Sequence, residues 1–312
     1  MPLYRPALLL VLMFALAACA NTSASQRVAV APAAAPATTA ANDQLYALAW
    51  VQTSIEFQSV TRTIYASATR RMAHVLEWHQ LAVKGSDADE RAAAAARIAA
   101  WNAMPIDERA NNDDGQPLAI ILDADETVID NSPYQARRFD LNSGYDRESW
   151  AAWVAEQRAA AIPGAVEFTR WAAANDIAVF YISNRGADGS AATVANLRAL
   201  GFPHPENAER VLLLDDSRGF GRDKVSRRQL VDRDYRVIGV FGDNIGDFIS
   251  GTSTDVAGRQ RRLETYRDWW GDRWYALPNP MYGSWVDALT AHCDQGASNA
   301  PRDCMNAALR RN

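Results

Sequence analysis

The stretch that most constrains the fold is an aliphatic run that ends abruptly in acidic residues. Four of the five residues from Leu118 to Leu122 are bulky aliphatics, and Asp123 and Asp125 come soon after them. Such a run is typical of a strand that is buried on both faces in a parallel sheet. Two neighbouring aspartates at its end would be costly to bury without a counter-charge, and a divalent cation would supply one. The alternative interpretation is an acidic turn between a strand and a loop.

Three further strands are predicted at residues 177–182, 211–214 and 235–241, with helices between them. Strands that alternate with helices imply a parallel sheet with right-handed crossovers, in which ligands bind beyond the carboxyl ends of the strands. Ser183 follows the first of these strands, and Asp243 with Asp247 follows the last. The predicted fold class is therefore α/β, with a Rossmann-like parallel sheet.

The first residues have the pattern of a targeting segment and a tether. An apolar run that ends at Ala18 is too short to span a bilayer comfortably, so it predicts a signal peptide over residues 1–18. The run ends Leu-Ala-Ala-Cys19, which resembles the lipobox of bacterial lipoproteins and implies a lipid on Cys19. Residues 19–41 are rich in Ala, Thr, Ser and Pro and predict a flexible tether. An ordinary cleavable signal with an incidental cysteine is the alternative.

Residues 42–312 are expected to form one domain with three parts. These parts are N-terminal helices over 42–104, an α/β core over 117–252 and an aromatic-rich tail over 258–312. Apolar residues at helical spacing predict one helix that starts at Gln44 and runs through Leu76. A second helix is predicted from Ser86 to Trp101, with Ser86 as its N-cap.

The acidic stretch resembles the D-x-D-x-T/V signature of the haloacid dehalogenase superfamily of phosphohydrolases. The longer string Asp123-Ala-Asp-Glu-Thr-Val-Ile-Asp-Asn-Ser-Pro-Tyr134 is more specific, and it resembles the class C non-specific acid phosphatases of the bacterial outer-membrane lipoprotein type. Their usual string has Leu at the position of Ala124, which is not a catalytic side chain in the family. The segment from Trp50 to Phe57 also resembles their first helix. The resemblance implies a sheet of the haloacid dehalogenase type, covered by the N-terminal helices and the C-terminal tail.

The resemblance also implies a reaction. Asp123 would attack phosphorus to form an aspartyl-phosphate, and Asp125 would protonate the leaving group and then activate water. The implied cofactor is Mg²⁺, held by the Asp123 carboxylate, the Asp125 backbone carbonyl and Asp243. Asp247 would touch the ion or lie just outside its ligands. The substrates implied are nucleoside monophosphates and other organic phosphomonoesters, as for a 5′-nucleotidase.

Three residues are candidates for holding the phosphoryl group. Ser183 and Asn184 stand at the end of a buried strand, where a hydroxyl and the following amides could hold a phosphate oxygen. Lys224 would supply a positive charge, and the family pattern of a Lys followed by an Arg three residues later matches Lys224 and Arg227. The neighbouring arginines 222, 227 and 228 remain alternatives to Lys224.

Aromatic residues near the proposed site suggest how a base or ring could be held. Tyr134 and Tyr282 are both predicted in proline-containing loops, and stacking on their rings would tolerate any base. The alternative is that these rings only pack the tail onto the core. Near the C-terminus, Cys293 and Cys304 are an even pair, which predicts a disulfide in an oxidising compartment and two free thiols otherwise.

The composition limits the kinds of partner that the chain is expected to bind. The net charge of −5 and the pI near 5.5 argue against a nucleic acid polymer as the main partner. The expected partners are a small phosphomonoester, a membrane through the lipid anchor and, as relatives suggest, a second copy of the chain. Ala20, rather than Asp, follows the lipobox cysteine, which favours the outer membrane, facing the periplasm or the cell surface. Two other functions stay open: a ligand-binding lipoprotein without turnover, and a phosphatase or phosphotransferase dedicated to one metabolite.

Overall fold

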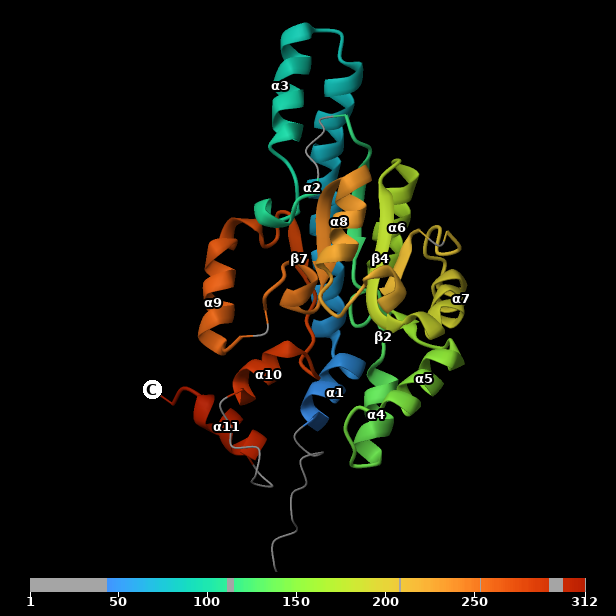
Figure 1. Ribbon diagram of the computed structural model, residues 1–312, viewed down its shortest axis with the longest axis vertical. Helices are drawn as coiled ribbons and strands as arrows, with labels where there is room; N and C mark the ends of the chain where they lie inside the picture. Colours follow the sequence, from blue (N-terminus) through green and yellow to red (C-terminus); the bar gives the residue numbers. More distant parts are fainter. Residues whose placement is uncertain (1–43, 111–114, 208, 253, 292–299, 312) are drawn as a thin grey trace, which may run out of the picture. The chain divides into compact units, whose positions relative to one another are not determined.

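Five parallel strands form the central sheet in the order β5-β4-β1-β6-β7 (Figure 1). The computed structural model describes residues 44–110, 115–207, 209–252, 254–291 and 300–311, which belong to one compact unit spanning residues 38–312. The strands are β1 (Leu118–Leu122), β4 (Ala178–Gly186), β5 (Val211–Leu214), β6 (Arg236–Gly242) and β7 (Trp274–Ala276). The α/β fold class and the four predicted strands are confirmed. The edge strand β7 was not predicted, because three residues are too few for a periodicity to be recognised.

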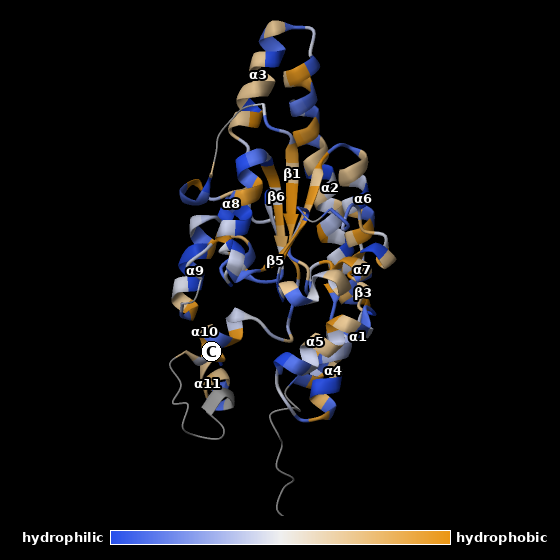
Figure 2. Cartoon of the chain, turned by 45° about the vertical axis from the view of Figure 1, so that its right-hand side comes forward, coloured by the Kyte–Doolittle hydropathy of each residue, from blue (hydrophilic) through white to orange (hydrophobic). Residues whose placement is uncertain are grey.

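Strand β1 lies between β4 and β6, and all five of its residues are buried. Its residues alternate between the two faces: Ile120 packs into one hydrophobic cluster and Ile121 into the other. Figure 2 shows the strand as a hydrophobic ribbon at the centre of the fold. The amide of Asp123 donates a hydrogen bond to the carbonyl of Phe241 at 2.9 Å, so the pairing with β6 continues past the strand end. The acidic residues after β1 and after β6 therefore leave the sheet at the same edge.

Helix α2 (Ile55–Lys84) covers one face of the sheet. Its Tyr65 ring stacks on Phe241 of β6 with the centroids 5.8 Å apart, and Phe241 stacks on Tyr275 of β7 at 4.8 Å. Such aromatic pairs contribute about 0.5–1.5 kcal/mol beyond the area they bury. The Tyr65 hydroxyl also donates to the carbonyl of Thr127 at 2.7 Å. The helix therefore holds both the sheet and the loop that follows Asp123.

The N-terminal helices differ from the prediction in two places. The predicted helix from Gln44 is divided into α1 (Leu45–Thr53) and α2, because Ser54 takes an extended conformation and its hydroxyl caps the amide of Phe57 at 3.0 Å. The next helix, α3 (Ala88–Ala99), is capped by Asp87 and not by Ser86. The carboxylate of Asp87 accepts a hydrogen bond from the amide of Glu90 at 2.8 Å, so the N-cap lies one residue later than predicted.

The aromatic-rich tail packs on the other face. Trp274 of β7 is fully buried, and its indole nitrogen donates to the carbonyl of Ala103 at 2.7 Å. The rings of Phe248, Trp269 and Trp270 surround it at centroid distances of 5.1–5.5 Å. Trp274 therefore belongs to the hydrophobic core, and Trp269 and Trp270 pack against it.

The remaining elements connect and cover the sheet (Figure 1). A second, two-stranded antiparallel sheet pairs β2 (Ile129–Asp130) with β3 (Ala160–Ala161). The other helices are α4 (Ser132–Asp140), α5 (Arg147–Glu156), α6 (Ala165–Ala174), α7 (Ser190–Leu200), α8 (Val225–Asp234), α9 (Val256–Thr265), α10 (Ser284–Thr290) and α11 (Ala300–Ala308). Short 3₁₀ turns are η2 (Ile106–Glu108), η3 (Ala187–Gly189), η4 (Asp216–Arg218), η5 (Ile245–Asp247) and η6 (Arg267–Trp269). Among the described residues, no helix is both long enough and apolar enough to cross a bilayer.

Candidate active site

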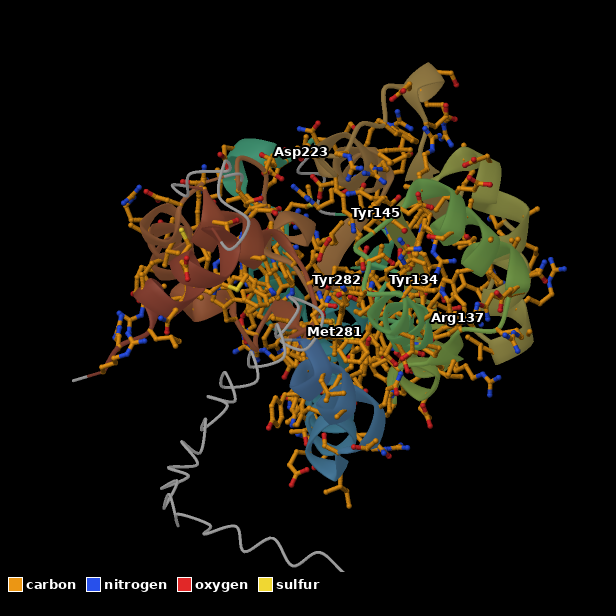
Figure 3. All side chains as sticks on the ribbon, turned by 90° about the horizontal axis from the view of Figure 1, so that it is seen from below. Tyr134, Arg137, Tyr145, Asp223, Met281 and Tyr282 are labelled. Atoms are coloured by element: carbon orange, nitrogen blue, oxygen red, sulfur yellow. The ribbon has the colours of Figure 1, made fainter. Side chains whose placement is uncertain are left out.

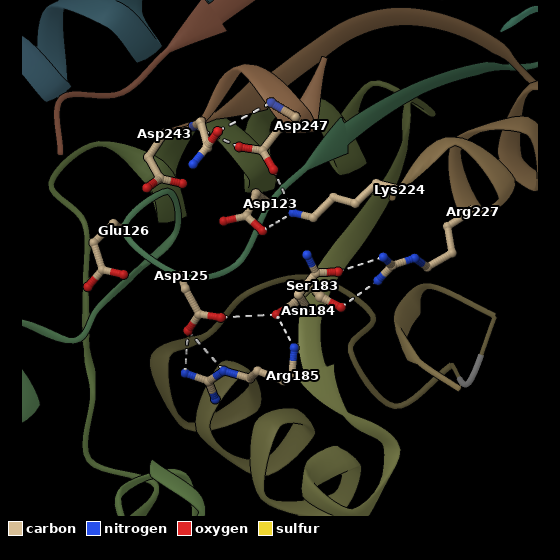
Figure 4. A network of polar contacts seen from close by, with 12 residues as sticks. Asp123, Asp125, Glu126, Ser183, Asn184, Arg185, Lys224, Arg227, Asp243 and Asp247 are labelled. Carbon is tan, nitrogen blue, oxygen red and sulfur yellow. Dashed lines mark hydrogen bonds and ion pairs between the residues drawn. The ribbon is translucent and has the colours of Figure 1, made fainter. Parts of the chain in front are cut away.

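Three aspartates meet at the carboxyl edge of the sheet. Carboxylate oxygens of Asp123, Asp243 and Asp247 lie within 4.8 Å of one another (Figure 4). Asp123 follows β1, while Asp243 and Asp247 come from the loop after β6 and its 3₁₀ turn η5. A Cβ atom on Gly242 would lie 2.4 Å from the Cβ of Asp247, so only glycine lets that carboxylate fold back toward the site. The register of β1 and β6 thus creates a cluster of hard oxygen ligands.

The cluster is electrostatically costly on its own. Burial, together with the charges of Asp247 and Asp125, raises the pKa of Asp123 to about 7, although Lys224 opposes this. Burial and the charges of Asp247 and Asp123 raise the pKa of Asp243 well above its ordinary value. A divalent cation with oxygen ligands would reduce this penalty, because Lys224 supplies only one positive charge to the three carboxylates. The donor set therefore fits a hard cation such as Mg²⁺.

Lys224 reaches the cluster from the N-terminus of α8. Its ammonium group donates to Oδ1 of Asp123 and, at 2.7 Å, to Oδ1 of Asp247, and its side chain is 6% exposed. Burial alone would lower its pKa, but these two carboxylates raise it above the ordinary value of a lysine. Lys224 is therefore a charged group in direct contact with Asp123.

Asp125 points away from the cluster, toward the end of β4 (Figure 4). Its Oδ2 accepts the hydroxyl of Ser183 at 3.0 Å, and its Oδ1 accepts two guanidinium nitrogens of Arg185 at 2.8 and 2.9 Å. Burial raises the pKa of Asp125, but the charge and hydrogen bonds of Arg185 outweigh it and hold the pKa below the ordinary value. An ionised carboxylate is thus stabilised at this position.

Asn184 is held by groups outside the cluster. Its side-chain oxygen accepts Arg227 at 2.6 Å, and its amide group donates to the carbonyl of Arg222 at 3.0 Å. Arg227 also donates to the carbonyl of Ser183 at 2.6 Å. Both ends of the Asn184 side chain are therefore occupied by contacts that fix the backbone at the end of β4. Of the arginines weighed against Lys224, Arg227 serves this backbone, and Lys224 is the cation that touches Asp123.

A buried ion pair supports the loop that carries the acidic residues. Arg228 is fully buried, donates to the carbonyls of Gly246 and Asp247 at 3.1 and 3.2 Å, and forms an ion pair with Glu108 of η2. Glu108 in turn accepts the backbone amide and the hydroxyl of Ser250, both at 2.6 Å. Breaking a buried pair by removing one partner costs about 3–5 kcal/mol, so the loop's position is strongly specified.

A pocket of about 960 Å³ opens over these groups. Its lining includes Asp123, Asp125, Lys224 and Asp243 at the base, and Tyr145 and Tyr282 among the residues around it (Figure 3). The Tyr282 hydroxyl donates to Glu126, which is itself buried beside Asp125. Burial and the charges of Asp125 and Asp243 raise the pKa of Glu126 well above its ordinary value. The pocket therefore combines carboxylates that could bind a cation at its base with an aromatic wall, which is formed by Tyr145, Trp150 and Tyr282.

Comparison with known proteins agrees with this geometry. The family model of acid phosphatases of the HAD superfamily, subfamily IIIB, matches residues 87–285, which is more than half of the chain. The chain belongs to this family. Its structure is similar to that of the class C acid phosphatase from Bacillus anthracis, with a TM-score of 0.70 and 27% identity; the match covers 88% of this chain and 99% of that one. That structure was determined with tungstate bound.

Curated relatives are more distant. The chain is 25% identical to a stem 28 kDa glycoprotein of Glycine max over 167 residues, which cover 52% of this chain and 58% of the relative. It is 26% identical to acid phosphatase 1 of Solanum lycopersicum over 176 residues, which cover 54% of this chain and 60% of the relative. The chain thus matches less than two thirds of the length of these relatives. The predicted family and superfamily are confirmed.

The candidate active site brings together most of the residues that the sequence singled out. They are Asp123, Asp125, Ser183, Asn184, Lys224, Asp243 and Asp247, which meet through the contacts above, and Tyr282, which lines the pocket. Tyr134 does not join them as predicted. It lies in helix α4 and not in a loop, and it is only 2% exposed. Its ring packs edge-on against Trp150 at 5.0 Å, and its hydroxyl contacts Ser149.

The placement of Tyr134 has a simple cause. Pro133 occupies the first turn of α4, where a proline is well tolerated, so the proline starts a helix and does not mark a loop. The rings that do line the pocket in this region are those of Tyr145, just before α5, and Trp150, in α5.

Sequence reasoning missed several residues of the site. Arg185 and Asn131 bind the side chain of Asp125, and Asn279 donates to Asp243 at 2.7 Å. Arg185 and Asn131 were visible as polar residues next to the motifs, at the end of β4 and within the string after Asp123. Asn279 comes from the tail, 36 residues after Asp243, and no local pattern indicates it.

Of the three cysteines, only Cys304 is among the described residues. Cys304 is disulfide-bonded. Cys293 and Cys19 lie outside the described residues, so the pairing with Cys293 and the lipid on Cys19 stay predictions.

Proposed function

We propose that the chain is a Mg²⁺-dependent phosphomonoesterase that acts through an aspartyl-phosphate intermediate. One observation carries the proposal: a buried carboxylate, Asp123, lies in contact with Lys224 and within 4.8 Å of two further carboxylates at the floor of one pocket. Phosphoryl transfer asks for a positioned nucleophile, neutralisation of charge and a proton for the leaving group. Each of these requirements has a candidate residue at the base of the pocket.

Asp123 is the proposed nucleophile and Asp125 the proposed acid and base. Asp123 is the carboxylate that Lys224 neutralises, so its attack on a negatively charged phosphoryl group meets less repulsion. Asp125 is ionised in this environment, which suits the removal of a proton from water in the second step. An entering phosphoryl dianion would raise the pKa of Asp125 by its charge, which favours the protonated form required in the first step.

The proposed cation would be held by the Asp123 carboxylate, the Asp125 backbone carbonyl and Asp243, with Asp247 beside them. When bound, it would supply positive charge to the phosphoryl oxygens. Asn279 donates to one oxygen of Asp243 and so orients it. Ser183 and the amides that follow it, with Lys224, are the proposed ligands of the phosphoryl oxygens. The Asn184 side chain would act by fixing those amides, since both of its ends are already bonded.

The proposed function predicts broad activity that depends on the cation. Purified protein without its first 41 residues should hydrolyse several phosphomonoesters, among them nucleoside monophosphates, p-nitrophenyl phosphate and glycerol phosphate, when Mg²⁺ is present. Release of inorganic phosphate is the measurement, and a phosphodiester serves as the control that should remain intact. Turnover of a single compound in the panel would point to a dedicated phosphatase, and no turnover at all would contradict the proposal.

Substrate recognition is proposed to use the aromatic wall. Tyr282 is partly exposed and lines the pocket, and Trp150 and Tyr145 line it from the α4–α5 region. A base can stack on such rings whatever its identity, and each stacked base is worth about 1–3 kcal/mol. This contribution fits broad use of nucleoside monophosphates, with Tyr282 as the ring that we expect to be used.

We predict that Tyr282→Ala raises KM for 5′-nucleotides about ten-fold or more and leaves KM for glycerol phosphate almost unchanged. The matched variant Tyr282→Phe keeps the ring and removes only the hydroxyl that contacts Glu126. Steady-state kinetics on both substrates should therefore find the phenylalanine variant close to wild type for nucleotides. Equal losses on the two substrates in the alanine variant would mean that Tyr282 supports the fold and does not stack.

The proposed location follows from the N-terminal residues alone. We propose export through the signal peptide, attachment to the outer membrane by lipid on Cys19, and a folded domain on the periplasmic side or at the cell surface. A disulfide at Cys304 is consistent with an oxidising compartment. A homodimer is proposed only by analogy with relatives.

A further inference from the structure

The two oxygens of the Asp125 carboxylate have unequal surroundings. Oδ1 accepts three N–H groups: Nε and Nη2 of Arg185 at 2.9 and 2.8 Å, and Nδ2 of Asn131 at 2.8 Å. Oδ2 accepts only the hydroxyl of Ser183, at 3.0 Å, among the described residues. A carboxylate oxygen offers about two lone pairs, so Oδ1 is saturated and Oδ2 still has room for a partner.

The groups that saturate Oδ1 are themselves fixed. Arg185 is 3% exposed, and its Nη1 donates to Thr193 of α7 at 3.2 Å. Its guanidinium lies over the ring of Trp150, 5.5 Å from the centroid. Asn131 is fully buried, and its side-chain oxygen accepts the indole nitrogen of Trp153 at 2.8 Å and Nη2 of Arg185 at 3.2 Å. Figure 4 shows the guanidinium of Arg185 beneath the carboxylate of Asp125.

The partner of Oδ2 is of a different kind. Ser183 is a proposed ligand of the phosphoryl group, and a hydroxyl can turn about its Cβ–Oγ bond at little cost. When that hydroxyl turns to a phosphoryl oxygen, Oδ2 loses its contact while Oδ1 keeps all of its own. The structure thus contains a fixed oxygen and a releasable oxygen on one carboxylate.

We propose that Arg185, assisted by Asn131, is a positioning residue that anchors Oδ1 of Asp125 and so makes Oδ2 the oxygen that exchanges protons with the reacting groups. The inference rests on the proposed function. In the first step, the bond from Asp123 to phosphorus forms as the bond to the leaving oxygen breaks, and the proton on Oδ2 moves to that oxygen to give the alcohol. In the second step, Oδ2 takes a proton from water as the water oxygen attacks phosphorus, and the bond to Asp123 breaks to release inorganic phosphate.

The test compares leaving groups that differ in their need for a proton. An alkoxide, as from glycerol phosphate, leaves slowly unless it is protonated, whereas p-nitrophenolate leaves readily without help. Since a positioned general acid contributes about 10²–10⁴-fold, Arg185→Met should lower kcat/KM for glycerol phosphate by about 100-fold or more. The loss for p-nitrophenyl phosphate should be at least ten-fold smaller. Arg185→Lys, which keeps the buried charge but offers a compact group, should fall between wild type and the methionine variant.

Controls separate positioning from folding. Arg210→Met removes another partly buried guanidinium, which lies 4.4 Å from the ring centroid of Phe180 and takes no part in the site, and it should leave both activities unchanged. Thermal midpoints of the three variants show whether each is folded, and Arg185→Lys carries the test if the methionine variant does not fold. Equal losses on both substrates in a folded Arg185 variant would overturn the inference. An Asp123→Asn variant that stays active would overturn the proposed function instead, so the two failures are distinguishable.

Discussion

The Asp123→Asn variant is expected to fold and to lose phosphatase activity by several orders of magnitude. Loss of a covalent nucleophile removes the reaction path and not merely a contact, and single nucleophile substitutions in other enzymes reach about 10⁶-fold in kcat. Folding should survive for two reasons. Asparagine has nearly the same volume as aspartate, and Lys224 keeps its 2.7 Å contact with Asp247, so its buried charge is not left without a partner.

Two measurements check this expectation. The first is kcat with p-nitrophenyl phosphate, whose good leaving group makes the assay sensitive to residual attack. The second is acid quenching after a brief incubation with ³²P-labelled substrate, which should label the wild-type protein and not the variant. Asp215→Asn is a matched control, because Asp215 follows strand β5 of the same sheet and its carboxylate only caps the turn at Ser217. If the Asp123 variant kept more than about a tenth of wild-type kcat, the assignment of the nucleophile would be wrong.

The Asp243→Asn variant is expected to bind Mg²⁺ about 100-fold more weakly, or worse. Mutation of a residue that only supports a metal ligand lowers the metal affinity by about 10–100-fold, and Asp243 is itself a proposed ligand. The amide oxygen of the new side chain can still accept the hydrogen bond from Asn279, so the local structure should persist. The substitution therefore removes a negative charge and leaves the shape of the side chain nearly unchanged.

Calorimetric titration of Mg²⁺ into the substrate-free protein measures this effect independently of turnover. Asp287→Asn is the control of equal charge, because Asp287 also borders the pocket but stands outside the cluster of three carboxylates. Removal of metal by chelation should abolish the activity of the wild-type protein, and added Mg²⁺ should restore it. Full activity after exhaustive dialysis against EDTA would remove the cation from the mechanism.

Local sequence was sufficient for the parts of the site that lie on strand ends. A strand buried on both faces of a parallel sheet is apolar over most of its length, so the residue at which polarity begins lies near its carboxyl end. This reasoning located Asp123, Ser183 and Asp243 at one edge of the sheet, and the resemblance of the string from Asp123 to Tyr134 gave the family. The register of β1 against β6 then brings two of these residues into one cluster.

Local sequence was insufficient wherever a residue's role depends on partners far along the chain. Tyr134 was expected to face a substrate because it follows Pro133, but its burial is decided by Trp150, which packs against it from a separate helix. Arg185 was visible beside Ser183, but its role follows from contacts to Asp125 and Asn131, more than 50 residues earlier.

The sequence by itself determined the α/β class, the central strand and the acidic residues at its end, because these depend on hydrophobic periodicity and on the cost of burying charge. The tertiary structure alone decided which side chains turn toward the pocket and which are used by the core. The physical reason is that a side chain's direction and partners are set by whichever element packs against it. No pattern within its own segment specifies that element, as the Asn279 contact to Asp243 and the ion pair of Glu108 with Arg228 demonstrate.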